Sequence, residues 1–283
     1  MVPFEKLGIV AGRGDLPLKV AQRASSMGVG VTVLILKDQA DPTLYQDQYA
    51  CHIIRMGAAQ ASIDLVRSLG IRDLVFVGAV NRPSLFELRP DKKALTIVGS
   101  SLMKLGDDGL LRSVISYLEE KEGLIVHPIH TILDDIMPET GQLGALAVPS
   151  EVQADIDKGC AVLNAMAGLD IGQAVVVQNG VILGVEAAEG TDSLIERCGH
   201  LKRAGREGGP GPVLVKLSKR QQTERADLPT IGPNTISSAA RAGFSGVVIQ
   251  AGRSLLVSKA ETIAAADAAG LFLLAVTDGN DTQ

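Results

Sequence analysis

The sequence predicts an α/β protein with two domains, a Rossmann-like N-terminal domain on a parallel sheet and a mixed α/β C-terminal domain. Short aliphatic runs alternate with amphipathic helical patterns in the first half, as in parallel sheets with helical crossovers. Two apolar runs flank Asn179-Gly180 in the second half, which is typical of a β-hairpin. An irregular stretch containing Gly and Pro separates the halves, so we expect domains at 1–138 and 150–283 with a linker at 139–149.

Composition excludes several classes of function. The chain of 283 residues is 46% hydrophobic but only 3% aromatic, with no Trp, so its core must be aliphatic. A net charge of -5 argues against a nucleic-acid-binding protein, for which a basic surface is expected. The 3 Cys residues have no paired spacing, which indicates buried thiols in a reducing compartment. Because neither a signal peptide nor a long apolar run is present, we expect a soluble cytoplasmic protein.

The chain opens with a strand–loop–helix–strand pattern, with apolar runs at 7–11 and 29–36 and a helical pattern between them. The turn Gly12-Arg13-Gly14 precedes the helix, where backbone N–H groups can bind a phosphate. A tight turn that requires glycine explains the same residues equally well. The full dinucleotide fingerprint is absent, because Pro17 and Leu18 occupy the place of its third glycine.

The same alternation continues with a strand at 51–55, a helix at 58–69 and a strand at 74–77. Asn81-Arg82-Pro83 follows this last strand at the carboxyl edge of the predicted sheet, where open parallel sheets bind ligands. We therefore expect Asn81 and Arg82 to meet the same ligand as Gly12 to Gly14. The alternative is that Asn-Arg-Pro is simply a good turn.

Two helices, at 95–105 and 110–121, and a strand at 124–127 complete the predicted N-terminal domain. Asp107 and Asp108 lie at the start of the second helix, where acidic side chains stabilise the helix dipole. Capping accounts for both residues, and a metal-binding role is the alternative.

The C-terminal domain begins with Ser150 and Gln153, which have the spacing of a capping box for a helix that reaches about residue 167. The hairpin at 174–186 leads to a helix at 193–198 that Thr191 or Asp192 can cap. The other predicted elements are strands at 213–217, 246–250, 254–258 and 271–276, and helices at 234–242 and 260–269.

The segment from Lys219 to Pro233 is rich in charged residues and has neither helical nor strand periodicity. It is predicted to be a loop at the end of a strand, and loops on a rigid scaffold often carry function. Its cations can hold phosphate oxygens, and its carboxylates can hold a divalent metal or orient water. The alternative is a solvated connecting loop.

Six segments along nearly the whole chain carry a family resemblance, at 12–17, 81–83, 104–108, 169–173, 186–192 and 222–232. The most specific are Glu-Ala-Ala-Glu-Gly-Thr-Asp at 186–192 and Gln-Thr-Glu-Arg-Ala-Asp-Leu-Pro-Thr-Ile-Gly at 222–232. With them the chain resembles the LpxI family, the UDP-2,3-diacylglucosamine pyrophosphohydrolases of lipid A biosynthesis. It departs from the family at Arg13, where the family commonly has the second of three glycines. Arg13 is strained if that position needs a positive φ; otherwise its guanidinium can add a phosphate contact.

The resemblance implies a two-domain, homodimeric, Mg²⁺-dependent hydrolase of a Gram-negative bacterium. Its substrate would be a lipid-linked nucleotide sugar, split into UMP and 2,3-diacylglucosamine 1-phosphate by water that attacks the sugar-side phosphorus. It further implies a cytoplasmic enzyme that is peripheral to the inner membrane, with transient contact at the membrane surface for substrate and product.

The resemblance also assigns site residues. The catalytic aspartate of the family lies in an Arg-x-Asp-Leu-Pro motif, so Asp227 inherits that role. We expect Asp227 and Glu186 to bind Mg²⁺, and Lys219 and Arg225 to hold phosphate oxygens. The residues expected to bind substrate are Gly12, Arg13, Gly14, Asn81, Arg82, Asp107, Glu189, Gly190, Thr191, Asp192, Gln222 and Thr230.

Two other classes of function remain open from the residues. A nucleotide-dependent oxidoreductase would explain the opening glycines, but the third glycine is missing. A non-catalytic sensor of a nucleotide or phosphosugar would bind the ligand without releasing UMP. An assay of UMP release, with and without Mg²⁺, distinguishes these classes.

Overall fold

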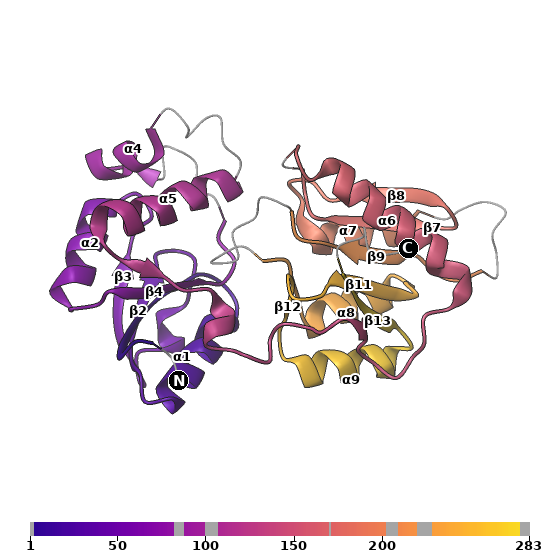
Figure 1. The fold of residues 1–283 in the computed structure, drawn as a ribbon, viewed down its shortest axis with the longest axis horizontal. Helices are drawn as coiled ribbons and strands as arrows, with labels where there is room; N and C mark the ends of the chain where they lie inside the picture. The colour runs from indigo at the N-terminus through magenta and orange to yellow at the C-terminus, as the bar shows by residue number, and fades with distance from the viewer. Residues whose placement is uncertain are drawn as a thin grey trace. The chain divides into compact units, whose positions relative to one another are not determined.

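The structure, a computed structural model, describes residues 3–81, 88–99, 107–169, 171–201, 209–219 and 228–277. The chain divides between Asp134 and Asp135 into two compact units (Figure 1). Each unit contains a β-sheet with helices packed against it, which confirms the predicted two-part α/β fold class.

The N-terminal unit is built on a five-stranded sheet in the order β3-β2-β1-β4-β5, and every neighbouring pair is parallel. Its strands are β1 (Lys6–Ala11), β2 (Gly30–Leu36), β3 (Ala50–Ile54), β4 (Asp73–Val77) and β5 (Ile125–Val126). The chain builds outward from β1 to β3 and then crosses over to β4. The carboxyl ends of β1 and β4 therefore border a topological switch point, where sheets of this kind bind ligands.

Successive side chains of β2 point to opposite faces of this sheet, and each face has its own hydrophobic core. Val33 and Ile35 pack with the fully buried Tyr45 on the face that also contacts α1 (Leu16–Ser26). Leu34 and Leu36 face the other way, toward α2 (Ala59–Ser68) and α5 (Asp107–Glu122). The aliphatic core expected from the composition is thus formed in two layers, one on each side of the sheet.

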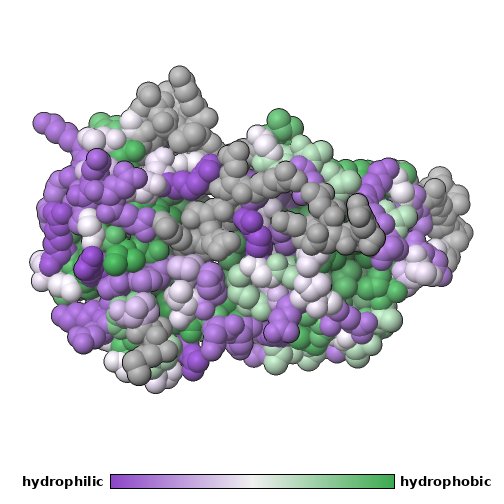
Figure 2. Space-filling model, in the orientation of Figure 1, coloured by the Kyte–Doolittle hydropathy of each residue, from purple (hydrophilic) through white to green (hydrophobic). Residues whose placement is uncertain are grey.

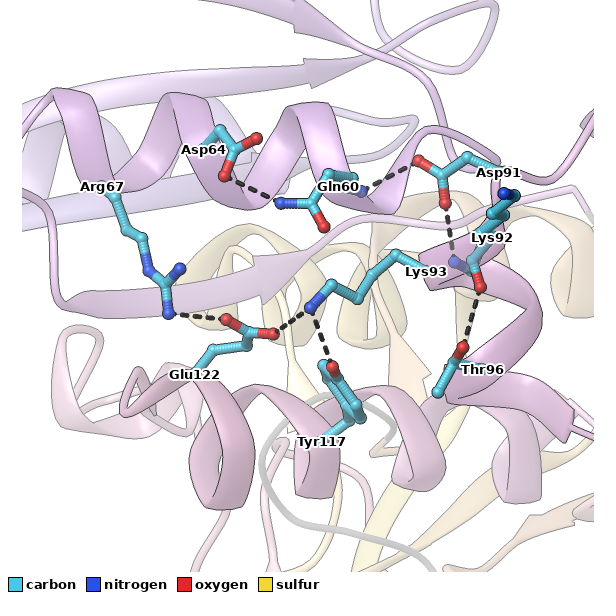
Figure 3. Close-up of polar contacts among 10 residues, drawn as sticks. Gln60, Asp64, Arg67, Asp91, Lys92, Lys93, Thr96, Tyr117 and Glu122 are labelled. Atoms are coloured by element: carbon cyan, nitrogen blue, oxygen red, sulfur yellow. Dashed lines mark hydrogen bonds and ion pairs between the residues drawn. The ribbon is translucent and has the colours of Figure 1, made fainter.

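A polar cluster joins α2, α4 (Lys92–Val98) and α5 (Figure 3). The Glu122 side chain, only 5% exposed, accepts hydrogen bonds from Arg67 at 2.6 Å and Lys93 at 2.9 Å. Lys93 also lies 3.1 Å from the hydroxyl of Tyr117. Asp91 caps α4 through one carboxylate oxygen and accepts a backbone N–H of α2 through the other. These contacts fix α4 to both neighbouring helices.

The C-terminal unit has a six-stranded mixed sheet in the order β6-β13-β11-β9-β7-β8. The pairs β13–β11 and β11–β9 are parallel, and the outer pairs are antiparallel. Its strands are β6 (Gly141–Gln142), β7 (Ala174–Gln178), β8 (Val181–Val185), β9 (Val213–Lys216), β11 (Gly246–Gln250) and β13 (Phe272–Val276). Strand β6 lies within the stretch expected to be a linker. A separate pair consists of β10 (Thr230–Ile231) and β12 (Leu255–Leu256).

Helices cover both faces of this second sheet (Figure 1). Val175 and Val177 of β7 face α6 (Gln153–Met166), whereas Ala174 and Val176 face the opposite side. The helices on that side are α7 (Gly190–Gly199), α8 (Pro233–Arg241) and α9 (Lys259–Ala269). Because both faces are covered, the central strands are continuous apolar runs.

The predicted hairpin is confirmed, and a buried carboxylate supports its turn. Asn179 and Gly180 both have positive φ, 52° and 75°, as a two-residue hairpin turn with the favoured twist requires. Asp155 on α6 is 2% exposed, and its carboxylate accepts the N–H of Asn179 at 2.6 Å and of Gly180 at 2.5 Å. The turn is therefore tied to the helix that covers its sheet.

The predicted capping box is wrong. A 3₁₀ turn at Ser150–Val152 precedes α6, and no side chain caps the helix. The Ser150 hydroxyl contacts Glu151, and the Gln153 amide bonds to Asp157. Pro149 directs the chain into the 3₁₀ turn, so Ser150 is displaced from the first N–H groups of the helix.

Three other elements have different limits from those predicted. Helix α7 begins at Gly190, so Thr191 and Asp192 lie within its first turn and do not cap it. Helix α4 begins at Lys92 and not at residue 95, because the Asp91 carboxylate provides a cap three residues earlier. Strand β12 has only two residues, because it pairs only with the two-residue β10.

Hydrophilic residues dominate the face of the N-terminal unit shown in Figure 2, with hydrophobic residues visible between them.

Cys160 and Cys198 are buried as predicted, whereas Cys51 is only half-buried. Burial raises the pKa of the Cys160 thiol to about 11. Within the described ranges, no helix combines the length and apolar character that crossing a membrane requires.

Candidate functional site

The first candidate site lies at the carboxyl edge of the N-terminal sheet, in the loops after β1 and β4. The Gly12 N–H donates to the carbonyl of Val77 at 2.8 Å, and Arg13 and Ala79 exchange two backbone hydrogen bonds. A Cβ atom at Gly12 would lie 2.7 Å from the Ala79 carbonyl oxygen. Glycine at this position therefore lets the two loops meet at the switch point.

Arg13 and Asn81 are brought together at this edge, as predicted for a shared ligand site. The φ angle of Arg13 is negative, so arginine is not strained where the family commonly has glycine. Its guanidinium donates to the side-chain oxygen of Asn81. The Gln39 amide holds the main chain of Asn81, accepting its N–H at 2.8 Å and donating to its carbonyl at 3.3 Å. Gly14 has a φ of 97° and open space beside it.

The second candidate site, here called the polar edge, lies where β8, β9 and β11 end and β7 begins. Antiparallel pairing of β7 with β8 and β9 brings these four ends to one side of the sheet. The polar edge consists of Gln173, Glu186, Thr191, Lys216, Ser218 and Gln250. Of the 6 buried polar residues in the described ranges, 3 belong to it: Glu186, Lys216 and Gln250. Burying charge is costly unless it is compensated, so such a concentration marks a candidate functional site.

Glu186 occupies the centre of this edge and is 7% exposed. One carboxylate oxygen accepts the backbone N–H of Gln173 at 2.8 Å, and the other accepts the hydroxyl of Thr191 at 2.6 Å. The same hydroxyl accepts a hydrogen bond from the Nζ of Lys216 at 2.9 Å. Lys216, also 7% exposed, donates in addition to the carbonyl of Thr230 at 3.1 Å. A buried cation and a buried carboxylate are thus linked through one hydroxyl group.

Gln250 extends the polar edge along the neighbouring strand. It is 3% exposed, and its side-chain oxygen accepts the backbone N–H of Ser218 at 2.9 Å. The backbone N–H of Gln250 donates to the hydroxyl of the buried Ser254 at 3.1 Å. The bond to Ser218 fixes the chain directly after β9, immediately before Lys219.

Glu189 shapes the loop that joins β8 to α7. Arg197 donates to its carboxylate from Nη2 at 2.8 Å and Nε at 3.2 Å, and the backbone of Ala187 donates at 3.1 Å. The Arg197 hydrogen bond holds the pKa of the Glu189 carboxyl below its usual value. Glu189 therefore ties its loop to α7 through Arg197.

The other predicted site residues are distributed around these two edges. Lys219 is half-buried beyond the end of β9, and Thr230 opens β10. Gly190 begins α7 with a φ of 80°, and Asp192 is exposed in its first turn. Asp107 is the first residue of α5. Four predicted residues lie outside the described ranges: Arg82, Gln222, Arg225 and Asp227.

Sequence reasoning missed Lys216 and Gln250. Both are the last residues of their strands, Val-Leu-Val-Lys and Gly-Val-Val-Ile-Gln. A polar residue that closes a buried apolar run was a usable signal, because parallel strands place their ligand contacts at this end.

The described residues contain no cluster of three or more His, Cys, Asp or Glu that could hold a metal ion. Mg²⁺ commonly uses only one or two carboxylates, completed by waters and substrate phosphates. Glu186 accepts one hydrogen bond at each oxygen, and a carboxylate oxygen has a further lone pair. Glu186 therefore fits as one carboxylate contributor to such a site.

Together these features define a two-unit α/β protein with a polar candidate site at the edge of each sheet. Within that class, the chain belongs to the LpxI family. The LpxI N-terminal domain model matches residues 6–136, and the LpxI C-terminal domain model matches residues 139–274. A curated relative, UDP-2,3-diacylglucosamine pyrophosphatase LpxI of Caulobacter vibrioides, is 40% identical over 277 residues, covering 96% of this chain and 98% of the relative.

Solved structures that match the chain include two biotin carboxylases. One, from the 2-oxoglutarate carboxylase of Hydrogenobacter thermophilus, matches with 12% identity and a TM-score of 0.27, covering 71% of this chain and 41% of that chain. The other, the biotin carboxylase subunit of pyruvate carboxylase, matches with 14% identity and a TM-score of 0.23, covering 62% of this chain and 35% of that chain.

Proposed function

We propose that the protein is an enzyme of lipid A synthesis that hydrolyses the diphosphate linkage of UDP-2,3-diacylglucosamine. The observation that carries this proposal is the 40% identity to the curated pyrophosphatase over 96% of the chain. Two of the most specific motifs have described residues at the polar edge: Glu186 and Thr191 belong to it, and the carbonyl of Thr230 accepts a hydrogen bond from Lys216. The substrate class is accordingly a lipid-linked nucleotide sugar.

The proposed reaction consumes one water and forms UMP and 2,3-diacylglucosamine 1-phosphate. The water oxygen bonds to the sugar-side phosphorus while the bond from this phosphorus to the bridging oxygen breaks. The bridging oxygen leaves with UMP, and the water protons pass to solvent or to the product phosphates. Since negative charge develops on the phosphate oxygens, cationic groups supply most of the catalytic stabilisation.

Within this proposal, Asp227 and Glu186 hold Mg²⁺, which would neutralise phosphate charge when bound. Lys219 and Arg225 hold phosphate oxygens, because cationic donors make strong charge-assisted hydrogen bonds to them. The Gly12 to Gly14 loop and the Arg13–Asn81 pair are assigned to the nucleotide end of the substrate. Support comes from their place at the switch point of the N-terminal sheet.

The test is an assay of UMP release from UDP-2,3-diacylglucosamine, with added Mg²⁺ and with a chelator in its place. The proposal expects UMP only when the metal is present. In ¹⁸O-labelled water, the label should appear in the sugar 1-phosphate and not in UMP. Substrate binding without UMP release would identify a sensor, and NAD(P) binding in a fluorescence titration would favour an oxidoreductase.

We further propose a homodimer located in the cytoplasm, in transient contact with the inner-membrane surface. The substrate supports the membrane contact, because its acyl chains partition into lipid. Sedimentation of the purified protein should give twice the monomer mass of 29.6 kDa. Flotation with anionic vesicles should recover more protein when the vesicles contain substrate. A monomer by sedimentation, or identical flotation with and without substrate, would reject the respective part.

A further inference from the structure

Lys216 is a buried cation to which the proposed reaction has so far given no role. Within the described part of the chain, it is the one Lys or Arg among the buried residues. A buried strand does not need a lysine at its last position. Burying an ammonium group costs free energy unless its donors are satisfied. A specific purpose at the polar edge is therefore expected.

The hydrogen bonds of Lys216 have a fixed direction. An ammonium group has only donors, so the Thr191 hydroxyl must accept from Lys216 at 2.9 Å. The single proton of that hydroxyl is then directed to Glu186, whose oxygen lies 2.6 Å away. Because the other Glu186 oxygen accepts the N–H of Gln173 at 2.8 Å, both carboxylate oxygens are held in one orientation.

Lys216 also connects the two segments that carry the most specific family motifs, although it belongs to neither. Its second acceptor is the carbonyl of Thr230, three residues after Asp227 in the chain. The same short stretch is held to β12, because the N–H of Leu255 donates to Pro229 at 2.7 Å. The described end of the Asp227-bearing segment is thus anchored on the strand that ends at Lys216.

We propose that Lys216 is a positioning residue for the hydrolysis: it orients Glu186 through Thr191 and anchors the chain that carries Asp227. This inference rests on the proposed function. Lys216 acts through other residues and forms no bond to the reacting atoms. Its loss therefore lowers the turnover of bound substrate more than it lowers substrate binding.

The first test replaces Lys216 by Met, which keeps an unbranched side chain and removes the donors. We expect kcat for UMP release to fall about 10- to 100-fold, since small misplacements of reacting groups have effects of this size, while KM changes less than about threefold. Lys158→Met is the matched control. Lys158 is exposed on α6 and also donates to a backbone carbonyl, that of Gly180 at 2.7 Å. The kcat of the Lys158→Met enzyme should therefore stay within about twofold of the wild-type value.

The second test uses the hydroxyl that Lys216 orients. Thr191→Val removes the hydroxyl and should lower kcat to a similar extent, whereas Thr191→Ser keeps it and should retain most of the activity. The double variant K216M/T191V should lose no more than K216M alone, because Lys216 acts on Glu186 only through Thr191. Additive losses would show that the two side chains act independently and would overturn the relay through Thr191.

A folded Lys216→Met enzyme with unchanged kcat would reject the positioning role. If that variant does not fold, Thr191→Val decides: full kcat in this variant rejects the orientation of Glu186 by Lys216 through Thr191. Calorimetry measures the substrate dissociation constant of each variant and so distinguishes a loss of turnover from a loss of affinity. Absence of UMP release by the wild-type protein would instead refute the proposed function itself.

Discussion

Buried carboxylates organise the C-terminal unit at the scale of single residues. Asp155 stabilises the hairpin turn, because each of its carboxylate oxygens accepts one backbone N–H. Glu186 is held at the polar edge in the same manner, with one backbone N–H and one hydroxyl as donors. Both are almost fully shielded from solvent, at 2% and 7% exposure. A buried carboxylate that accepts several hydrogen bonds is stabilising, and removing it leaves its donors unsatisfied.

Asp155→Ala is predicted to destabilise the protein by about 2 to 4 kcal/mol, because two charge-assisted hydrogen bonds are lost and two N–H groups become unsatisfied. Urea unfolding at pH 7 measures the change. Asp157→Ala is the control, since Asp157 is exposed on the same helix, and should change stability by less than about 0.5 kcal/mol. Equal effects of the two variants would show that the turn does not depend on Asp155.

The sequence reveals some single-residue roles and conceals others. The Asn179-Gly180 turn is legible because positive φ at both positions restricts the residue types. Asp155 is concealed, because its two partners lie 24 and 25 residues away and only the fold brings them together. Thr191 was expected to cap a helix and instead bonds to Glu186, since α7 begins one residue before it.

At the scale of elements, ion pairs connect α2, α4 and α5. The Glu122 carboxylate lies between Arg67 of α2 and Lys93 of α4 (Figure 3). The hydrogen bond from Lys93 is the main reason that the pKa of Glu122 is lowered. The pKa of Lys93 is raised in turn by its bonds to Tyr117 and Glu122.

This cluster predicts a pH dependence of stability. Because the folded-state pKa of Glu122 is lowered, its contribution is complete above the usual carboxyl pKa of 4.5 and disappears as pH falls through the lower folded value. Glu122→Gln should cost about 1 to 2 kcal/mol at pH 7 and progressively less below pH 4.5 in urea unfolding. Glu120→Gln, an exposed position of the same helix, should show no such trend. A pH-independent cost for Glu122→Gln would contradict the ion-pair explanation.

The loops at the switch point predict a second effect at this scale. Gly12→Ala would place a methyl group 2.7 Å from the Ala79 carbonyl oxygen, which belongs to backbone and cannot easily move. We expect a loss of about 1 to 3 kcal/mol in the free energy of unfolding, the usual range for overpacking. Gly30→Ala is the control, because its added methyl group would lie 3.5 Å from the carbonyl oxygen of Glu5, an ordinary contact distance. Full stability of Gly12→Ala would show that the two loops need not approach closely.

Strands and hairpins were better predicted than the starts of helices. Strand positions follow from apolar runs with turns at their ends, and both sheets have this pattern. Helix starts depend on which side chain reaches the first free N–H groups, as Asp91 does for α4. Pro149 illustrates the difficulty, because a 3₁₀ turn takes the place of the expected cap.

For the whole molecule, the sequence predicted the parallel N-terminal sheet and the mixed C-terminal sheet correctly. The proximity of Arg13 and Asn81 was also expected, because both follow strands that end at one edge of the sheet. In the structure β1 and β4 pair directly, and the two side chains are hydrogen-bonded. The relay from Lys216 to Glu186 could not be predicted. Its members come from a strand, a helix and a loop whose juxtaposition requires the three-dimensional pairing of β7, β8 and β9.

The most direct test of the central claim is UMP release by Asp227→Ala, measured beside substrate binding by calorimetry and folding by circular dichroism. Asp157→Ala provides the control for removal of an exposed aspartate away from the proposed catalytic residues. We expect Asp227→Ala to fold and to bind UDP-2,3-diacylglucosamine but to release UMP at least about 1000-fold more slowly. Unchanged turnover in a folded Asp227→Ala protein would contradict the central claim.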